Sequence, residues 1–493
     1  MSIVNEPNRE PKRLSSDLGR PGHILRPLRR WWQRWSVRLL LVFVVCVVSF
    51  SSYYAYRRHV AMEKLRQAVA DLDRTDPGWR LQEIEAARAV IPEHENSAVV
   101  GAEAFRWLPQ GWPAREGIDR FTNLTPQEQL EAEDVACLRN DMAETEVALR
   151  DARKLATMPN GRYSITYKRD FISTLLPDVQ NARVVIELLH LDVILQAQDG
   201  DLKGALRSGR ALLNAARSIG DEPLLISQLV RMAGVGITCQ AVERVLAQGE
   251  PDPADLLALQ KLLEVEERFP RLLVGMRGER GGWHELLDAI ECGDASLNAL
   301  SGTRPSWSDR VTRFAERDYV RGEHPFFLTL ANEWVRIAAL PAHERVQAWG
   351  VLDAKSKSQP SIIARTLPPV AKMDEPARRA DGNLRCLIAA LAAERYRRQH
   401  GRWPATLDQL VPEFLPAVPL DPEDGEPLRF HQRPDRVVVY SLTKKPSAGV
   451  GPVAYDPDKL SPPGVGVAVH LFDLQHRRQP PSPKPAIVDD DPQ

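Results

Sequence analysis

The sequence predicts a mainly α-helical protein with a transmembrane helix near its N-terminus and a small α+β domain at its C-terminus. An apolar stretch without a charged residue covers residues 39–56. Apolar residues recur with helical spacing through residues 177–266, and residues 374–478 join one helical pattern to short runs typical of strands. Between these segments we expect an irregular stack of helical hairpins.

Length, charge and cysteine spacing narrow the class of protein. The 493 residues suffice for two or three domains. The 65 lysines and arginines nearly cancel the 66 aspartates and glutamates, so we expect no nucleic-acid partner. The cysteines lack paired spacing, which argues against a zinc site and favours free thiols, with one or two long-range disulfides as the alternative. They are Cys46, Cys137, Cys239, Cys292 and Cys386.

The N-terminal segment reads as a tail followed by an anchor. Residues 1–38 are basic, contain four prolines and show no sustained apolar period, so we expect a disordered tail. The run at 39–56 would form a helix about 27 Å long, close to the hydrocarbon thickness of a bilayer. Aromatic residues flank the run as in a membrane-interface belt: Trp31, Trp32, Trp35, Tyr53, Tyr54 and Tyr56. We interpret it as a retained signal anchor in contact with lipid, with a cleaved signal peptide as the alternative.

Flanking charge orients the anchor. Six arginines lie between residues 20 and 38, on its N-terminal side, and five basic residues lie between residues 57 and 74 on the other. We therefore place the tail in the cytoplasm and the body, which begins with residues 57–370, on the opposite side of the membrane.

Helix signals predict the first part of that body. The anchor helix should continue over residues 60–72. Asp76-Pro77 should cap and start a helix that ends at Pro92, and another should cover residues 98–108. Thr125-Pro126-Gln127-Glu128 matches a capping box and predicts a helix reaching about Ala156.

Residues 177–266 form the clearest helical tract. Apolar stripes, one of which contains Leu188, are separated by turns at Gly200 and Gly220. The tract therefore predicts antiparallel hairpins. One turn, residues 198–206, looks like the turn of a tetratricopeptide repeat, so a peptide-binding solenoid is the alternative.

Two further segments precede the C-terminal domain. Residues 269–290 should be helical despite four glycines, which would allow close helix packing or a kink. Residues 319–367 should alternate helical pieces with breaks at His324-Pro325, Pro341 and Pro360. Pro368-Pro369 is the expected boundary before residues 374–478, which should fold on their own.

The C-terminal domain combines a helix with short strands. Residues 378–399 should form an amphipathic helix whose face carries Leu384, Leu387, Ile388 and Leu391. A short helix over Leu407 and Leu410 and a proline-rich connection follow. Residues 428–430 and 437–440 should be strands, joined after the turn at Asp424-Gly425. Val437 and Val439 would cover the helix, and Trp403 and Phe414 would close the core. Gly464 to Gly466 is interpreted as turn or strand punctuation.

The order of these elements, with ERYRRQHGRWP, LVPEFLPAVPLDPEDGEPLRF and VVVYSL, resembles the globular domain of the major pseudopilin of type II secretion systems. The resemblance covers about ninety residues. It implies a long helix laid against a small antiparallel sheet in an extracytoplasmic bacterial domain, and hence an anchor in the inner (cytoplasmic) membrane. The whole chain resembles membrane-anchored bacterial envelope proteins that carry this module at their end, which implies no activity.

Two features depart from that family. The anchor lies some three hundred residues before the module and lacks the family's processing site. The family's calcium loop is replaced by Thr443-Lys444-Lys445, and Asp456 and Asp458 supply too few oxygens for a calcium ion. We interpret Asp421 and Asp424 as turn formers. Residues 479–493, with five prolines, should be a disordered tail.

No motif carries a recognisable chemistry. His284-Glu285 lacks the second histidine of a zinc protease, and neither a nucleophile elbow nor a phosphate loop occurs. The acidic groups Glu83/Glu85 and Glu264/Glu266/Glu267 fall on predicted exposed faces. We therefore assign no catalytic, cofactor-binding or metal-binding residue and expect no cofactor.

Two functions remain open at this point. The first is a single-pass cell-envelope interaction or scaffold protein that binds a protein partner and no small-molecule ligand. The alternative is an envelope hydrolase whose residues converge from distant segments around residues 275–284. A deep pocket gathering His284 with carboxylates would favour the hydrolase.

Overall fold

A computed structural model describes residues 25–112, 121, 125–297, 307–358, 361, 370–442 and 465–481. In the segments that begin at residues 25, 307 and 465, side chains are described from residues 35, 313 and 466 onward. The chain divides into two compact units, Met1–Met62 and Glu63–Gln493. The described residues are mainly helical, with a small three-stranded sheet near the C-terminus and a long apolar helix near the N-terminus. This confirms the predicted class of fold.

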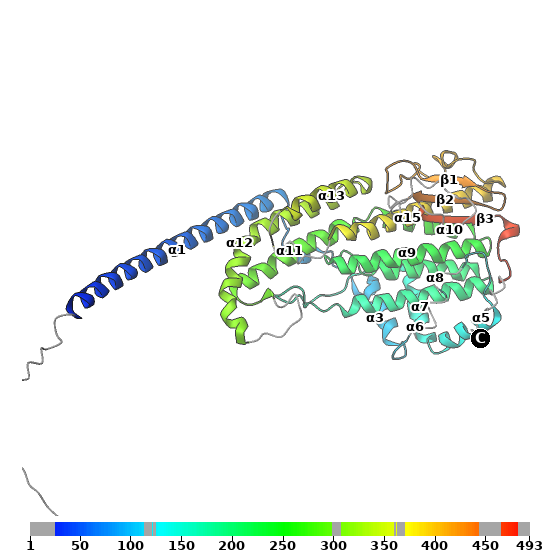
Figure 1. Cartoon of the computed structure of the whole chain (residues 1–493). Helices are drawn as coiled ribbons and strands as arrows, with labels where there is room; N and C mark the ends of the chain where they lie inside the picture. Colours follow the sequence, from blue (N-terminus) through cyan, green and yellow to red (C-terminus); the bar gives the residue numbers. More distant parts are fainter. Residues whose placement is uncertain are drawn as a thin grey trace, which may run out of the picture. The chain divides into compact units, whose positions relative to one another are not determined.

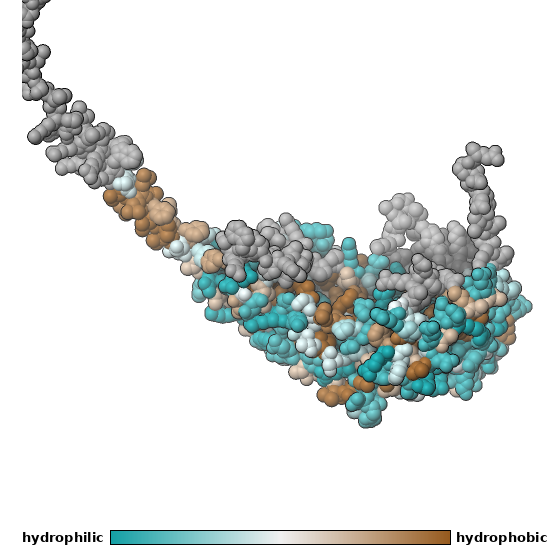
Figure 2. All heavy atoms as spheres, turned by 90° about the horizontal axis from the view of Figure 1, so that it is seen from below, coloured by the Kyte–Doolittle hydropathy of each residue, from teal (hydrophilic) through white to brown (hydrophobic). Residues whose placement is uncertain are grey.

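Helix α1, Leu25–Thr75, contains the whole predicted span. Its apolar side chains between residues 39 and 50 are exposed and form a brown stretch in Figure 2. By length and composition the helix is able to cross a membrane, a description that a signal sequence also meets. Helix α9, Leu225–Gln248, is also long and apolar enough, but most of its apolar stretch is buried inside the body.

Helix α1 begins earlier than the sequence predicts. Residues 25–38 are helical rather than part of a disordered tail. Pro27 lies in the first turn, where a missing backbone N–H costs nothing, and no later proline interrupts the helix. At its other end α1 continues past residues 60–72, as predicted.

The last turns of α1 pack on the body. Leu65, Val69 and Leu72 join a small apolar cluster with Trp79 and Leu328. The predicted helix start at Asp76-Pro77 is wrong, because α2, Leu81–Ala87, begins four residues later. Asp76 instead accepts hydrogen bonds from Arg277 and Arg280. Its carboxylate is therefore engaged in ion pairs and does not cap a helix.

The predicted capping box at Thr125 is also wrong. Residues 126–127 form a turn, and Glu128 forms a bridge with Gln479. Arg244 donates to the carbonyls of Thr125 and Glu128, and Gln248 donates to that of Glu128, at 3.0–3.2 Å. These tertiary bonds hold the segment in this non-helical conformation. The helices of this region are α3 Ser97–Arg106, α5 Ala132–Ala143 and α6 Glu146–Lys154, with 3-10 turns at Glu93–Glu95 and Leu155–Thr157.

The tract at 177–266 is confirmed as helical. Its helices are α7 Pro177–Asp199, α8 Leu202–Arg217, α9 and α10 Pro253–Glu267. Helices α7, α8 and α9 pack on one another and lie side by side in Figure 1. Gly200 and Gly220 adopt φ of 78° and 64°, the left-handed conformation that glycine adopts without strain. Leu188 is fully buried, as its stripe predicts.

The glycine-rich helix α11, Arg271–Cys292, uses its glycines for close packing. A methyl group on Gly278 would overlap the backbone of Pro223, and one on Gly282 would overlap the ring of Phe171. Helix α12, Trp307–Ala338, runs through Pro325, so the predicted break there is wrong. The break at Pro341 is confirmed, since α13, Ala342–Lys357, starts after it. Pro360, Pro368 and Pro369 lie outside the described residues.

The C-terminal part places α15, Asp374–His400, against an antiparallel sheet of order β1-β2-β3. Val439 pairs with Phe430 on one side and Val469 on the other. The third strand is not predicted from the sequence. The elements are 3-10 turns Val370–Met373, Leu407–Leu410 and Leu474–His476, and strands β1 Arg429–Gln432, β2 Arg436–Leu442 and β3 Val465–Phe472.

The middle of helix α15 is buried on all sides rather than on one. Leu384, Leu387 and Leu391 are fully buried as predicted, but Cys386 and the alanines at 389, 390, 392 and 393 are fully buried too. These small residues let α9 and α10 approach the face opposite the sheet. Residues of α7 to α10, α15 and the sheet therefore share one hydrophobic core, which continues across the expected boundary near residue 370.

Candidate functional site

Two adjoining grooves open in the body beside the end of α1. The first has a volume of about 400 Å³ and the second of about 520 Å³, and they share Leu273 and Arg277. We call them together the double groove. The first is lined by Pro77, Gly78, Ile84, Ala87, Arg88, Asp221, Pro270, Leu273, Val274 and Arg277. The second is lined by Leu72, Thr75, Asp76, Leu273, Arg277, Arg280, Asn332, Glu333, Val335, Arg336 and Ala339.

The lining combines aliphatic surface with paired charges. Arg88, whose side chain is 2% exposed, donates from Nε to Asp221 Oδ1 at 2.8 Å. Burial alone would lower the pKa of Arg88, but Asp221 and Glu85 raise it above its ordinary value. Arg277 donates to Asp76 at 2.7 Å. A groove of aliphatic walls with a few fixed polar groups has the composition of a binding site.

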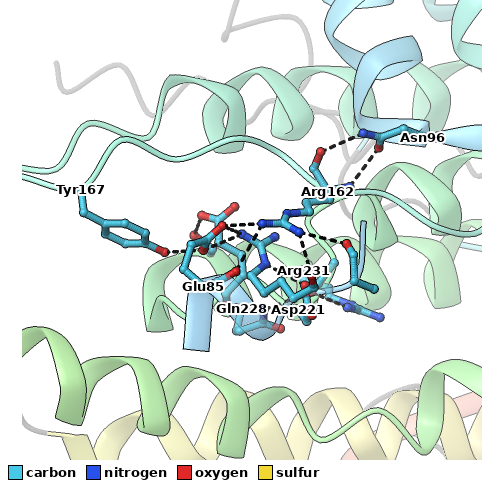
Figure 3. A network of polar contacts seen from close by, with 12 residues as sticks. Glu85, Asn96, Arg162, Tyr167, Asp221, Gln228 and Arg231 are labelled. Carbon is cyan, nitrogen blue, oxygen red and sulfur yellow. Dashed lines mark hydrogen bonds and ion pairs between the residues drawn. The ribbon is translucent and has the colours of Figure 1, made fainter. Parts of the chain in front are cut away.

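A network of hydrogen bonds and ion pairs holds Arg88 in place. Figure 3 shows Tyr167 and Arg162 of this network converging on Glu85. Glu85 Oε2 accepts from Arg88 at 3.0 Å and from the Tyr167 hydroxyl at 3.1 Å, and Glu85 Oε1 accepts from Arg162 at 3.0 Å. Burial and the Glu85 charge raise the pKa of Tyr167, so its hydroxyl remains a donor. Glu85 is therefore the centre of the network rather than a solvated surface acid, which corrects the prediction for it.

Arg162 fastens the segment before α7 to the groove. Its guanidinium donates to the carbonyls of Arg88 at 2.8 Å and Ala89 at 3.1 Å. The amide of Asn96 bonds both backbone groups of Arg162, at 2.9 and 3.0 Å. Because these partners all lie within residues 88–96, Arg162 joins the segment before α7 to the stretch that follows α2.

The α8–α9 turn forms the floor near Asp221. Gln228 donates to the carbonyl of Glu222 at 2.8 Å, and Arg231 donates to that of Gly220 at 2.7 Å. Glu222 itself is fully buried, which raises its pKa to about 7, and Ser227 donates to it. The turn is thus fixed by side chains of α9.

A chain of buried ion pairs continues from this turn. Glu266, fully buried, binds Arg231 at 2.5 and 3.0 Å and Arg271 at 3.0 Å. Arg271 also binds Asp381 of α15 at 2.6 Å, and Arg345 of α13 lies 3.3 Å from the same carboxylate. The prediction that Glu266 lies on an exposed face is wrong, because arginines from α9 and α11 enclose it.

His284 lies outside both linings. It contacts His324, with the facing ring nitrogens 2.8 Å apart, and the ring of Trp79. Among the described residues, no group of three or more histidine, cysteine or acidic side chains is arranged to hold a metal ion. The gathering of His284 with carboxylates in a pocket, which would favour the hydrolase, is not seen in the double groove.

Asp421 and Asp424 form a turn around an arginine. The amide of Glu423 donates to Asp421 at 2.9 Å and that of Glu426 to Asp424 at 3.0 Å, which is the expected turn-forming role. Both carboxylates bind Arg429. A guanidinium therefore supplies the positive charge between them. Lys444, Lys445, Asp456 and Asp458 lie outside the described residues.

Comparison of the chain with family models, with curated proteins and with solved structures finds no match. The double groove must therefore be judged on its own chemistry. Arg88 and Asp221 are 133 positions apart in the sequence, and Arg88, Asp221 and Arg277 belong to no local motif. Sequence reasoning missed them because only the packing of α2, the α8–α9 turn and α11 brings them together.

Proposed function

We propose that this is a single-pass, membrane-anchored protein of the bacterial cell envelope that binds a protein partner through the double groove. The observation that carries the proposal is the continuity of α1: one helix supplies the exposed apolar span and then the last turns that pack beside the groove. A membrane-anchored body that carries such a groove can hold a partner at the membrane.

Orientation and compartment are part of this proposal. The basic tail would lie in the cytoplasm and the body outside it, at the inner membrane. The resemblance of residues 374–478 to the secretion pseudopilin domain supports this placement, since that module is extracytoplasmic. The packing of helix α15 on a small antiparallel sheet supports this reading, because the resemblance implies a long helix against such a sheet. We propose a bracing role for this module.

Site-specific photocrosslinking tests partner binding. Val274 lines the first groove, whereas Val265 of α10 is 52% exposed elsewhere on the body and serves as the matched control. A photoreactive phenylalanine analogue at position 274 in intact cells is expected to give one discrete crosslinked species. Position 265 should give none. Equal crosslinking at both positions, or none at 274, would contradict partner binding in the groove.

A further inference from the structure

A relay of three side chains lies beneath the end of α1. Glu291 Oε1 is 2.7 Å from His324 Nδ1, and His324 Nε2 is 2.8 Å from His284 Nδ1. Glu291 and His284 belong to α11, and His324 belongs to α12. His324 is fully buried. The two hydrogen bonds of the relay thus help to fix the spacing between α11 and α12.

The bonding pattern assigns the protons. Arg321 pairs with Glu291 Oε2 at 3.4 Å, and Glu291 Oε1 accepts the Nδ1–H of His324. The bare Nε2 of His324 must then accept the Nδ1–H of His284. Both rings are neutral in this arrangement, and each of the two hydrogen bonds of the relay, which we call its joints, contains one proton. If both rings became charged, two N–H groups would face each other at the His284–His324 joint, which could not remain bonded.

The relay supports the residue that fastens α1. The ring of His284 lies 4.8 Å from that of Trp79, which is fully buried. Trp79 packs against Leu72 of α1 and Leu328 of α12, and its indole N–H donates to Asp73 of α1 at 2.9 Å. Trp79 therefore connects the last turns of α1 to the helix pair that the relay holds together.

The charges around His284 oppose a proton on it. Arg80 lies 4.9 Å over the Trp79 ring and Arg280 lies 5.7 Å from it, so two cations already face this indole. Asp73 and Asp76 are the acids on this side, and they are paired with Arg80 and with Arg277 and Arg280. From α12 the facing groups are His324 and Arg321. A charged His284 would therefore lie beside two carboxylates, Asp73 and Asp76, that are already paired with arginines.

We propose that the Glu291–His324–His284 relay is a proton-operated latch, which holds the last turns of α1 against α11 and α12 at neutral pH and releases them in acid. The depressed pKa of His284, about 3 because of burial, then His324 and Arg80, agrees with this direction. At pH values between this pKa and the ordinary histidine pKa of 6.5, the docked state binds fewer protons than the released state. Docking is therefore complete above pH 6.5 and is lost as the pH falls toward 3.

Hydrogen–deuterium exchange of the full chain in detergent micelles tests the latch. Peptides covering residues 65–79 are followed at pH 7.5 and 4.5, with correction for intrinsic exchange rates. A released His284 imidazole at pH 4.5 holds its proton about a hundredfold more often than not, so His284 shifts the docking equilibrium by up to about a hundredfold. We expect protection of these peptides to fall at least tenfold, while peptides of α7 and α8 keep theirs.

Variants separate the latch from general acid unfolding. His284→Asn cannot be charged and should abolish the pH dependence at residues 65–79, and the double variant His284→Asn/His324→Gln should do the same. His94, whose side chain is 80% exposed, gives the matched control: His94→Gln should keep the dependence. Equal protection at both pH values in the natural chain would overturn the proposal. So would simultaneous loss in α7 and α8, or a dependence that survives both relay variants.

Discussion

Replacing Glu266 with glutamine is expected to lower the free energy of unfolding by about 3–5 kcal/mol, the cost of removing one partner from a buried ion pair. The amide keeps the shape of the side chain but removes the charge that Arg231 and Arg271 share. Burial alone would raise the pKa of Glu266, but these arginines lower it, so the natural carboxylate is ionised. Urea unfolding followed by circular dichroism at 222 nm measures the loss.

The matched control is Glu103→Gln. Glu103 is 40% exposed and pairs with Arg106 one turn away on α3, so its removal should cost less than about 1 kcal/mol. If the two variants unfolded at the same urea concentration, the enclosed position of Glu266 would be wrong.

Expression of residues 374–478 alone is expected to give a polypeptide without a cooperative unfolding transition, although the sequence suggests an independent domain there. The fragment would expose the face of α15 that α9 and α10 cover, including Cys386. It would also separate Asp381 from Arg271, and His470 from Glu243, which lie 2.6 and 2.8 Å apart. Differential scanning calorimetry would detect any transition.

The control for this experiment is the unit Glu63–Gln493, which retains the shared core and should unfold cooperatively. Calcium and a chelator should give the same result for both polypeptides, because Arg429 already binds Asp421 and Asp424. A sharp transition in the short fragment would mean that its core is complete without α9 and α10.

Local signals predicted the helices of residues 177–266 because nothing distant competes with them. Gly200 caps α7 and Gly220 lies in the turn after α8, both in the left-handed conformation, and the stripe containing Leu188 faces a core made by neighbouring helices in the chain. Where local preference and packing agree in this way, periodicity suffices.

Predictions from local sequence failed where side chains from distant parts of the chain bind or pack against the segment. Thr125 can cap a helix, but the carbonyls around it are taken by Arg244 and Gln248 from α9. Pro325 removes a helical hydrogen bond, yet α12 continues because Phe327 and Leu328 are buried and His324 is held by the relay. Neither set of partners can be read from the residues beside these positions.

The candidate site was hidden for a related reason. Isolated acids on a helix are most often solvated, so Glu85 and Glu266 gave no signal in sequence. Their environment depends on arginines that arrive from α9, α11 and the segment before α7. A charge pattern along one helix predicts its exposed face, but it does not reveal which charges a second helix will enclose.

Extraction of membranes with alkaline carbonate is the most direct measurement of the central claim, that α1 anchors the body in a membrane. Burying the apolar residues between 39 and 50 in lipid should outweigh any surface attachment. The full chain is therefore expected in the membrane pellet, and the unit Glu63–Gln493, expressed without the first 62 residues, in the supernatant. Release of the full chain into the supernatant, or its recovery as a soluble form cleaved near Ser51, would contradict the account.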